Sequence, residues 1–129
     1  MGNKITDNLK IGTLGELLVQ LRLLQFNVQA APPIKDSGND LIAVRGEMFR
    51  GIQVKTTAGD RFSKPTLPKH YHIVAFVSLS SDDAGLYLDK SEIYLVPRAA
   101  IEKAGGVPRD LKPFLISENL IDEIFPAQS

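Results

Sequence analysis

The stretch KDSGNDLIAVRGEMFRGIQVKTT, residues 35–57, decides the fold of this chain. Residues 36–39 are typical turn formers, and the alternation over residues 40–45 predicts a strand that begins at Asp40. A hairpin turn at Gly46 and Glu47 would lead into a partner strand over residues 49–57. Asp40 would then lie on a strand beside the one that carries Gln53 and Lys55.

Residues 6–26, which precede this stretch, predict one long helix. Thr13 and Glu16 have the spacing of a capping box, and Gly15 indicates either a later helix start or a close backbone contact. Residues 27–34 predict an edge strand, because their two prolines cannot donate to a sheet ladder. Apolar residues recur near helical spacing in the helix at Leu9, Ile11, Leu14, Leu17, Leu18, Leu21, Leu24 and Phe26.

The second half of the chain predicts a loop over 58–70, strands and two short helices. Strands are expected at 71–79, 86–88 and 92–96, the first being the most apolar and central in the sheet. Helices are expected at 98–104, after Pro97, and at 118–125, capped by Ser117. The fold class is therefore α/β, with a mixed sheet packed on the long N-terminal helix. The last helix could cover its own sheet or contact another copy through Leu120, Ile124 and Phe125.

The length of 129 residues predicts one domain, with a core over about residues 6–98 and small helices over about 97–125. No apolar run approaches the roughly 18 residues of a membrane span, and residues 1–12 do not resemble a signal peptide. The chain has no cysteine, which excludes thiolate zinc sites and a cysteine nucleophile and fits a cytoplasmic location. The net charge is zero, but residues 1–70 carry ten basic and six acidic side chains, whereas residues 71–129 carry five and nine. A basic face is therefore possible despite the neutral total.

Gln53 and Lys55 are two residues apart on the predicted strand, so their side chains leave the same face about 6.5–7 Å apart. With Asp40 on the neighbouring strand, a carboxylate, an amide and an ammonium would meet, as at a metal ion beside a phosphate. The alternative is the polar outer face of an antiparallel pair. For Glu16 the alternative is a capping or solvent-facing carboxylate.

Three segments together resemble the PD-(D/E)XK nuclease superfamily: Gly15-Glu16, Ser-Gly-Asn-Asp-Leu at 37–41 and Gly-Ile-Gln-Val-Lys-Thr-Thr at 51–57. The resemblance is to a branch of small endonuclease-like proteins with a D…QxK pattern, related to Holliday-junction resolvases and one class of intron-encoded homing endonucleases. It covers about residues 12–98 and implies a restriction-endonuclease-like fold.

The resemblance also implies a role for each site residue. Asp40 would be the central ligand of Mg²⁺ or Mn²⁺, and Glu16 would reach the metal from the helix, directly or through water. Gln53 would occupy the position of an acidic ligand, and the backbone carbonyl of Val54 would be a further ligand. Lys55 would be the catalytic lysine, which orients or deprotonates the attacking water or stabilises charge on the phosphate.

DNA would be bound by basic side chains around this site, through phosphate contacts that depend on salt. Most of these charges could equally be ordinary solvated ones. His72 occupies a position that is often acidic in this superfamily, and we expect it to be structural. The candidate DNA contacts are Lys35, Arg45, Arg50, Arg61, Lys64, Lys69 and His70.

The resulting functional hypothesis is a metal-dependent endonuclease that hydrolyses DNA phosphodiester bonds. One such domain cuts one strand at a time, so cutting both strands requires a homodimer or higher homo-oligomer. The alternatives are a nuclease-fold module that binds DNA without cutting it, and a protein-interaction or assembly domain.

Overall fold

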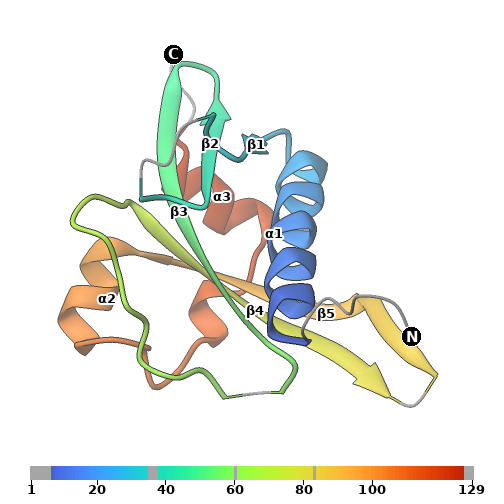
Figure 1. Cartoon of the computed structure of the whole chain (residues 1–129). Helices are drawn as coiled ribbons and strands as arrows, with labels where there is room; N and C mark the ends of the chain where they lie inside the picture. Colours follow the sequence, from blue (N-terminus) through green and yellow to red (C-terminus); the bar gives the residue numbers. More distant parts are fainter. Residues whose placement is uncertain (1–6, 35–37, 60, 83, 127–129) are drawn as a thin grey trace.

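The computed structural model describes residues 7–34, 38–59, 61–82 and 84–126 (Figure 1). The chain begins with a long helix, continues through five strands and ends in short helical segments. In chain order the elements are α1 (Asp7–Gln25), β1 (Gln29–Ala31), β2 (Leu41–Arg45), β3 (Met48–Thr57), β4 (Ile73–Asp82), β5 (Gly85–Pro97), α2 (Arg98–Ala104), the 3-10 turn η1 (Lys112–Phe114) and α3 (Glu118–Ile124).

The five strands form one mixed sheet in the order β1-β2-β3-β4-β5. Only β3 and β4 run parallel, and the other neighbours are antiparallel. The predicted hairpin is present, with Arg45 opposite Met48 and the turn at Gly46 and Glu47. The predicted α/β fold, a mixed sheet packed on a long N-terminal helix, is therefore confirmed. The apolar strand β4 lies inside the sheet, although the middle strand is β3.

Two strand predictions need correction. β1 spans only three residues of the predicted 27–34, because Pro32 and Pro33 have no N–H to donate. The two short strands predicted at 86–88 and 92–96 are one strand of 13 residues, β5. The register of β4 and β5 shifts between Ser78 and Ser80, where Ser91 Oγ accepts a 2.9 Å hydrogen bond from the Ser80 N–H. This bulge allows one strand to continue through the polar residues that separate residues 86–88 from residues 92–96.

The sheet carries an apolar core on each face. On one face, α1 and α3 pack in a cluster that includes Leu18, Leu23 and Ile52. On the other face, Val74 and Phe76 of β4 pack with Ile101 of α2. β3 therefore points Ile52 and Val54 toward α1.

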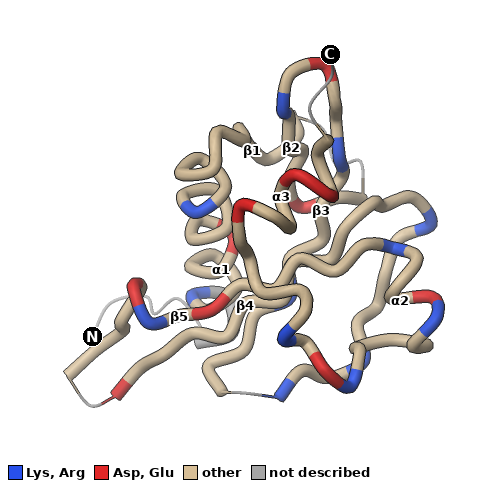
Figure 2. The backbone as a smooth tube through the Cα atoms, turned by 180° about the vertical axis from the view of Figure 1, so that it is seen from behind, with Lys and Arg blue, Asp and Glu red and all other residues tan. Residues whose placement is uncertain are grey.

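The C-terminal helix covers the sheet of its own chain. Leu120, Ile124 and Phe125 belong to the core and are at most 8% exposed, so they are not free to contact another copy. Ser117 caps α3 as predicted, since its hydroxyl accepts a hydrogen bond from the Leu120 N–H. Figure 2 shows that acidic residues gather on α3. Within the described segments, no helix has the length and apolar character needed to cross a membrane.

Candidate active site

The candidate site lies at an edge of β3 that β2 leaves unpaired. β2 begins at Leu41, opposite Ile52, so within the described segments no strand pairs with the part of β3 beyond Ile52 on that side. Asp40 occupies this position: its N–H donates to the Ile52 carbonyl at 3.0 Å, and its Oδ2 accepts from the Val54 N–H at 2.8 Å. A carboxylate thus takes the place of the missing strand.

The turn before Asp40 is held by contacts with β3 and with the loop before β4. Gly38 has φ of +86°, which favours glycine. Its carbonyl accepts a hydrogen bond from Gln53 Nε2, and Asn39 Nδ2 donates to the His70 carbonyl at 3.1 Å. Asn39 packs on Gly51, where an added Cβ would lie 2.8 Å from the Asn39 side chain. These contacts fix the carboxylate of Asp40 before any ligand binds.

Glu16 approaches the same edge from α1. Partial burial, and then the charge of Asp40, raise the pKa of Glu16 above its ordinary value of 4.5. The helix comes this close because Gly15 has no side chain, since a Cβ there would lie 1.8 Å from Thr56 Oγ1. The chain therefore holds two like-charged carboxylates near each other, which a bound cation would relieve.

Gln53 is almost fully buried, with 5% of its surface exposed. It follows Ile52, the last β3 residue paired with β2, and so lies beside Asp40, which directly precedes β2. Because its amide nitrogen is committed to Gly38, Gln53 positions the turn that carries Asp40. This role is separate from the ligand role that the resemblance implies.

Lys55 lies two residues beyond Gln53 and is half-buried. Among the described residues it has no hydrogen-bond or ion-pair partner, so its ammonium is available to a ligand. It lines an open, polar pocket of about 370 Å³ together with Arg61 and Lys64. Three hydroxyl-bearing residues, Thr57, Ser63 and Thr66, also line this pocket, whereas the hydroxyl of Thr56 is buried. Three cations and several hydroxyls suit a phosphate group.

The oxygen donors at this edge fit a divalent cation such as Mg²⁺. Glu16 and Asp40 supply two carboxylates, and Asp40 Oδ1 has no hydrogen bond within the described segments. The carbonyl of Val54 points to the same side of the strand as its N–H, and so toward Asp40. The described residues contain no cluster of three or more Asp, Glu, His or Cys suited to a metal. A metal here would therefore keep several waters, as Mg²⁺ commonly does.

The other predicted contacts are distributed unevenly. Lys69 and His70 are exposed in the loop after the Lys55 pocket, and Arg50 is half-buried beside His72. Arg45 lies apart, because it pairs with Asp122 at 2.9 Å and donates to the Phe125 carbonyl at 2.6 Å. Lys35 lies outside the described residues.

His72 has a backbone contact that explains its position. Its Nδ1 accepts a 2.8 Å hydrogen bond from the Gly51 N–H, which supports the structural role expected for it. Partial burial, and then the charges of Arg50 and Arg98, lower the pKa of His72 below its ordinary value of 6.5.

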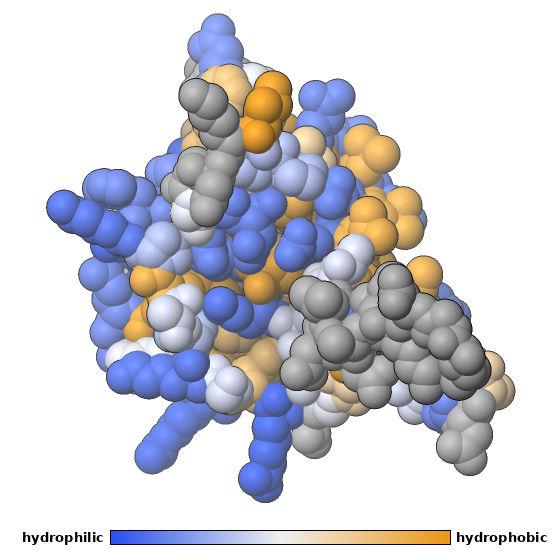
Figure 3. All heavy atoms as spheres, viewed as in Figure 1, coloured by the Kyte–Doolittle hydropathy of each residue, from blue (hydrophilic) through white to orange (hydrophobic). Residues whose placement is uncertain are grey.

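Figure 3 shows this side of the molecule, seen as in Figure 1. Hydrophilic residues cover the middle of this face, over β3 and the segment that follows it. Two residues of this region were given no role in the sequence analysis, Asn39 and Thr56. The sequence held signals for both. Asn39 belongs to the turn sequence Ser-Gly-Asn before Asp40, and Gly51 leaves room for its side chain. Gly15 leaves room for the side chain of Thr56.

Comparison with known proteins finds similarity at the level of the structure. No protein-family model matches the chain, and no curated protein matches it. The structure is similar to that of I-Ssp6803I, a bacterial homing endonuclease, with a TM-score of 0.62. The match covers 95% of this chain and 94% of that chain, at 15% sequence identity. At this identity the similarity shows the fold: the chain has a nuclease-like α/β fold.

Proposed function

We propose that this chain is a metal-dependent endonuclease of the PD-(D/E)XK type that hydrolyses DNA phosphodiester bonds. The observation that carries the proposal is the approach of Glu16 to Asp40 at the unpaired edge of β3, next to the pocket of Lys55. Paired carboxylates and a nearby lysine match the needs of phosphodiester hydrolysis, and the nuclease-like fold agrees with this chemistry.

Glu16, Asp40 and the Val54 carbonyl would hold Mg²⁺ or Mn²⁺. The bound ion would polarise the scissile phosphate and lower the pKa of a bound water. Lys55 would donate a hydrogen bond to a phosphate oxygen or to the attacking water, because its ammonium has no partner among the described residues. Arg61 and Lys64 line the same pocket and would bind the phosphate backbone of the strand being cut.

The test is nicking of supercoiled plasmid in Mg²⁺ or Mn²⁺ by the wild type and by Asp40→Asn, Lys55→Met and Lys103→Met. Lys103 is an exposed lysine of α2 and serves as the matched control. We expect nicking by the wild type and Lys103→Met, at least roughly 100-fold slower nicking by the other two, and no nicking with EDTA. Equal rates in all four proteins would mean that the activity comes from elsewhere.

A second candidate is a nuclease-fold module that binds DNA without cutting it. It is favoured by Gln53, whose neutral amide stands where most relatives of this kind would have a metal-binding acid and is already bonded to Gly38. Salt-sensitive DNA binding without cleavage, in any divalent metal, would support this candidate. Absence of both binding and cleavage would favour a protein-interaction domain.

A further inference from the structure

α1 has an apolar outer surface as well as an apolar inner one. Leu17, Leu21 and Leu24 follow each other at helical spacing and are 56%, 50% and 58% exposed. We call these three residues the leucine ridge. A helix on a free surface is normally polar on this side, and one that is apolar all round is normally covered. The sequence pattern alone did not separate the ridge from the leucines of the core.

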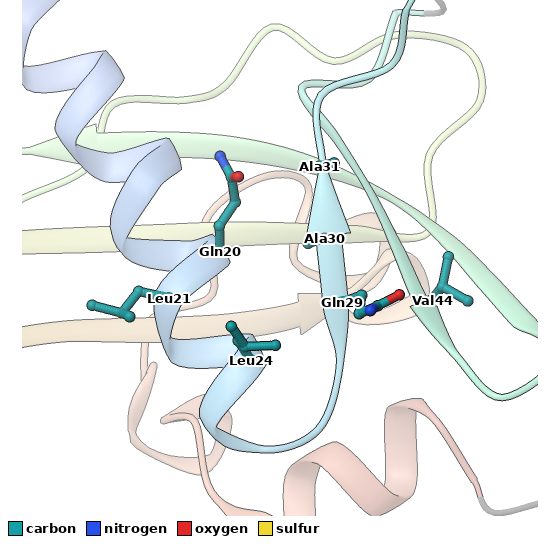
Figure 4. A pocket seen from close by; sticks show the side chains of 7 residues that line it. All are labelled: Gln20, Leu21, Leu24, Gln29, Ala30, Ala31 and Val44. Carbon is teal, nitrogen blue, oxygen red and sulfur yellow. The ribbon is translucent and has the colours of Figure 1, made fainter.

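A hollow flanks the ridge on each side. The first, about 480 Å³, lies between α1 and β1 and is lined by Gln20, Leu21, Leu24, Gln29, Ala30, Ala31 and Val44 (Figure 4). The second, about 510 Å³, lies toward β5 and is lined by Leu18, Leu21, Arg22, Gln25, Phe26, Leu88, Asp89 and Ile116. Figure 4 shows Gln20 and Leu24 on the side of α1 toward β1, with Leu21 pointing the other way.

We propose that the leucine ridge is the contact between two copies of this chain. A ridge beside a groove is complementary to a second copy of itself, as a two-fold symmetric interface requires. The hollow between α1 and β1 is lined only by uncharged residues, so two copies can approach there without charge repulsion. The same lack of charge disfavours DNA as the occupant.

The exposed apolar surface continues from α1 toward β5. Leu88 of β5 is 43% exposed and lines the second hollow with Leu21, so the ridge and Leu88 form one apolar patch of the kind that marks interaction sites. A stable interface of roughly 800 Å² per partner would extend beyond the ridge over the hollows and the surface around them. Figure 3 shows apolar residues gathered on the outer side of α1.

The dimer would link two catalytic edges. Glu16 precedes Leu17 on α1, so a contact along this helix would fix the position of one Glu16 relative to the other. This consequence rests on the proposed function: two sites are needed to cut both strands. The contact itself does not depend on it.

The first test is the mass in solution, by light scattering or sedimentation, of the wild type, Leu21→Glu and Ala99→Glu. Ala99 is an exposed residue of α2, so its variant adds the same charge to a helix outside the ridge. We expect the wild type and Ala99→Glu to have the mass of two chains and Leu21→Glu that of one, with unchanged circular dichroism. A wild type with the mass of one chain at every concentration, or a Leu21→Glu variant that remains dimeric, would overturn the proposal.

A second test introduces no charge at position 21, so its result does not depend on whether the fold tolerates Leu21→Glu. The chain has no cysteine, so Leu21→Cys and Ala99→Cys each introduce a single thiol. Under mild oxidation we expect rapid formation of covalent dimer with Leu21→Cys and little with Ala99→Cys, and equal rates would contradict the proposal.

If the wild type nicks and linearises plasmid, Leu21→Glu should still nick it but should not linearise it. A dimer without nuclease activity would disprove the proposed function alone.

Discussion

The carboxylate of Asp40 accepts a 2.8 Å hydrogen bond from the backbone N–H of Val54, on the side of β3 that β2 does not cover. The same residue thus completes the edge of the sheet and supplies a candidate metal ligand. These two roles can be separated, because the hydrogen bond needs only an oxygen at this position whereas a metal site needs the negative charge.

Two substitutions at Asp40 should therefore have similar effects on nicking activity but different effects on the stability of the fold. Asp40→Asn keeps an oxygen for the Val54 N–H, so we expect a small loss of stability and a loss of nicking of at least roughly 100-fold. Asp40→Ala leaves the N–H without its partner and should also cost about 1–3 kcal/mol. Chemical denaturation beside the nicking assay measures both effects. Equal stability losses in the two variants would contradict the role of the hydrogen bond.

Glu16 should lower stability at neutral pH. Its pKa in the folded protein is raised, so the charged form is disfavoured there and folding is penalised above that pKa. We expect Glu16→Gln to stabilise the protein at about pH 7.5, by less than about 1 kcal/mol because the group is only partly buried. The advantage should disappear as the pH falls toward 4.5. Denaturation at several pH values tests this.

A bound metal ion should offset the destabilisation that the negative charges of Glu16 and Asp40 cause in the folded protein. Mg²⁺ bound between Glu16 and Asp40 would stabilise the folded wild type and would raise its melting temperature more than that of Glu16→Gln. The comparison is made at one Mg²⁺ concentration, with an equal ionic strength of NaCl as control. Identical shifts in both proteins would argue against a metal held by Glu16.

Gln53→Glu tests the position at which the chain departs from the usual acidic ligand. The new carboxylate would face the carbonyl of Gly38 and would add a third negative charge near Asp40. In metal-free buffer we expect a loss of about 1–3 kcal/mol, partly recovered in Mg²⁺. Asn119→Asp, on an exposed residue of α3, serves as the control and should show neither effect. Unchanged stability of Gln53→Glu without metal would show that the bond to Gly38 contributes little.

Gly12 and Gly15 lie on the same helix but should respond oppositely to alanine. A Cβ at Gly12 would meet no atom within 4 Å, so Gly12→Ala should stabilise α1 by about 0.5–1 kcal/mol. A Cβ at Gly15 would lie 1.8 Å from Thr56 Oγ1, so Gly15→Ala should push α1 away and cost about 1–3 kcal/mol. Because Glu16 moves with the helix, nicking should fall as well. Equal effects of the two changes on stability would contradict the close approach of α1 and β3.

The sequence predicted those features that depend on neighbouring residues. The helix α1, the turn at Gly46 and Glu47 and the place of Asp40 at the start of the hairpin follow from local patterns, although β2 begins at Leu41, one residue later than predicted. The bulge that unites β5 could not be predicted, because it depends on a bond between Ser91 and Ser80 across two strands.

Side-chain partners were the least predictable part of the site. Arg45 has the charge of a DNA contact, but its partner Asp122 lies 77 residues away in the sequence. The amide of Gln53 is committed to the Gly38 carbonyl, a contact that exists only once the hairpin has formed. Such partners are set by tertiary packing, which spacing along the chain does not record.

His72 should make stability depend on pH near neutrality. Its Nδ1 accepts from the Gly51 N–H, and its pKa is lowered in the folded protein, so folding favours the neutral ring. The stabilisation is therefore complete above the unfolded pKa of 6.5 and is lost as the pH falls through the folded pKa. Between about pH 7.5 and 5.5 the wild type should lose less than about 1 kcal/mol from this group, because the ring is largely exposed.

His72→Asn tests this dependence without removing the acceptor. The Asn side-chain oxygen can take the place of Nδ1 toward the Gly51 N–H, whereas the titrating ring is absent. We expect a flatter pH profile of stability in His72→Asn than in the wild type, measured by chemical denaturation. His70→Asn should keep the wild-type dependence, since His72 is still present. A wild-type profile in His72→Asn would show that this histidine does not cause the dependence.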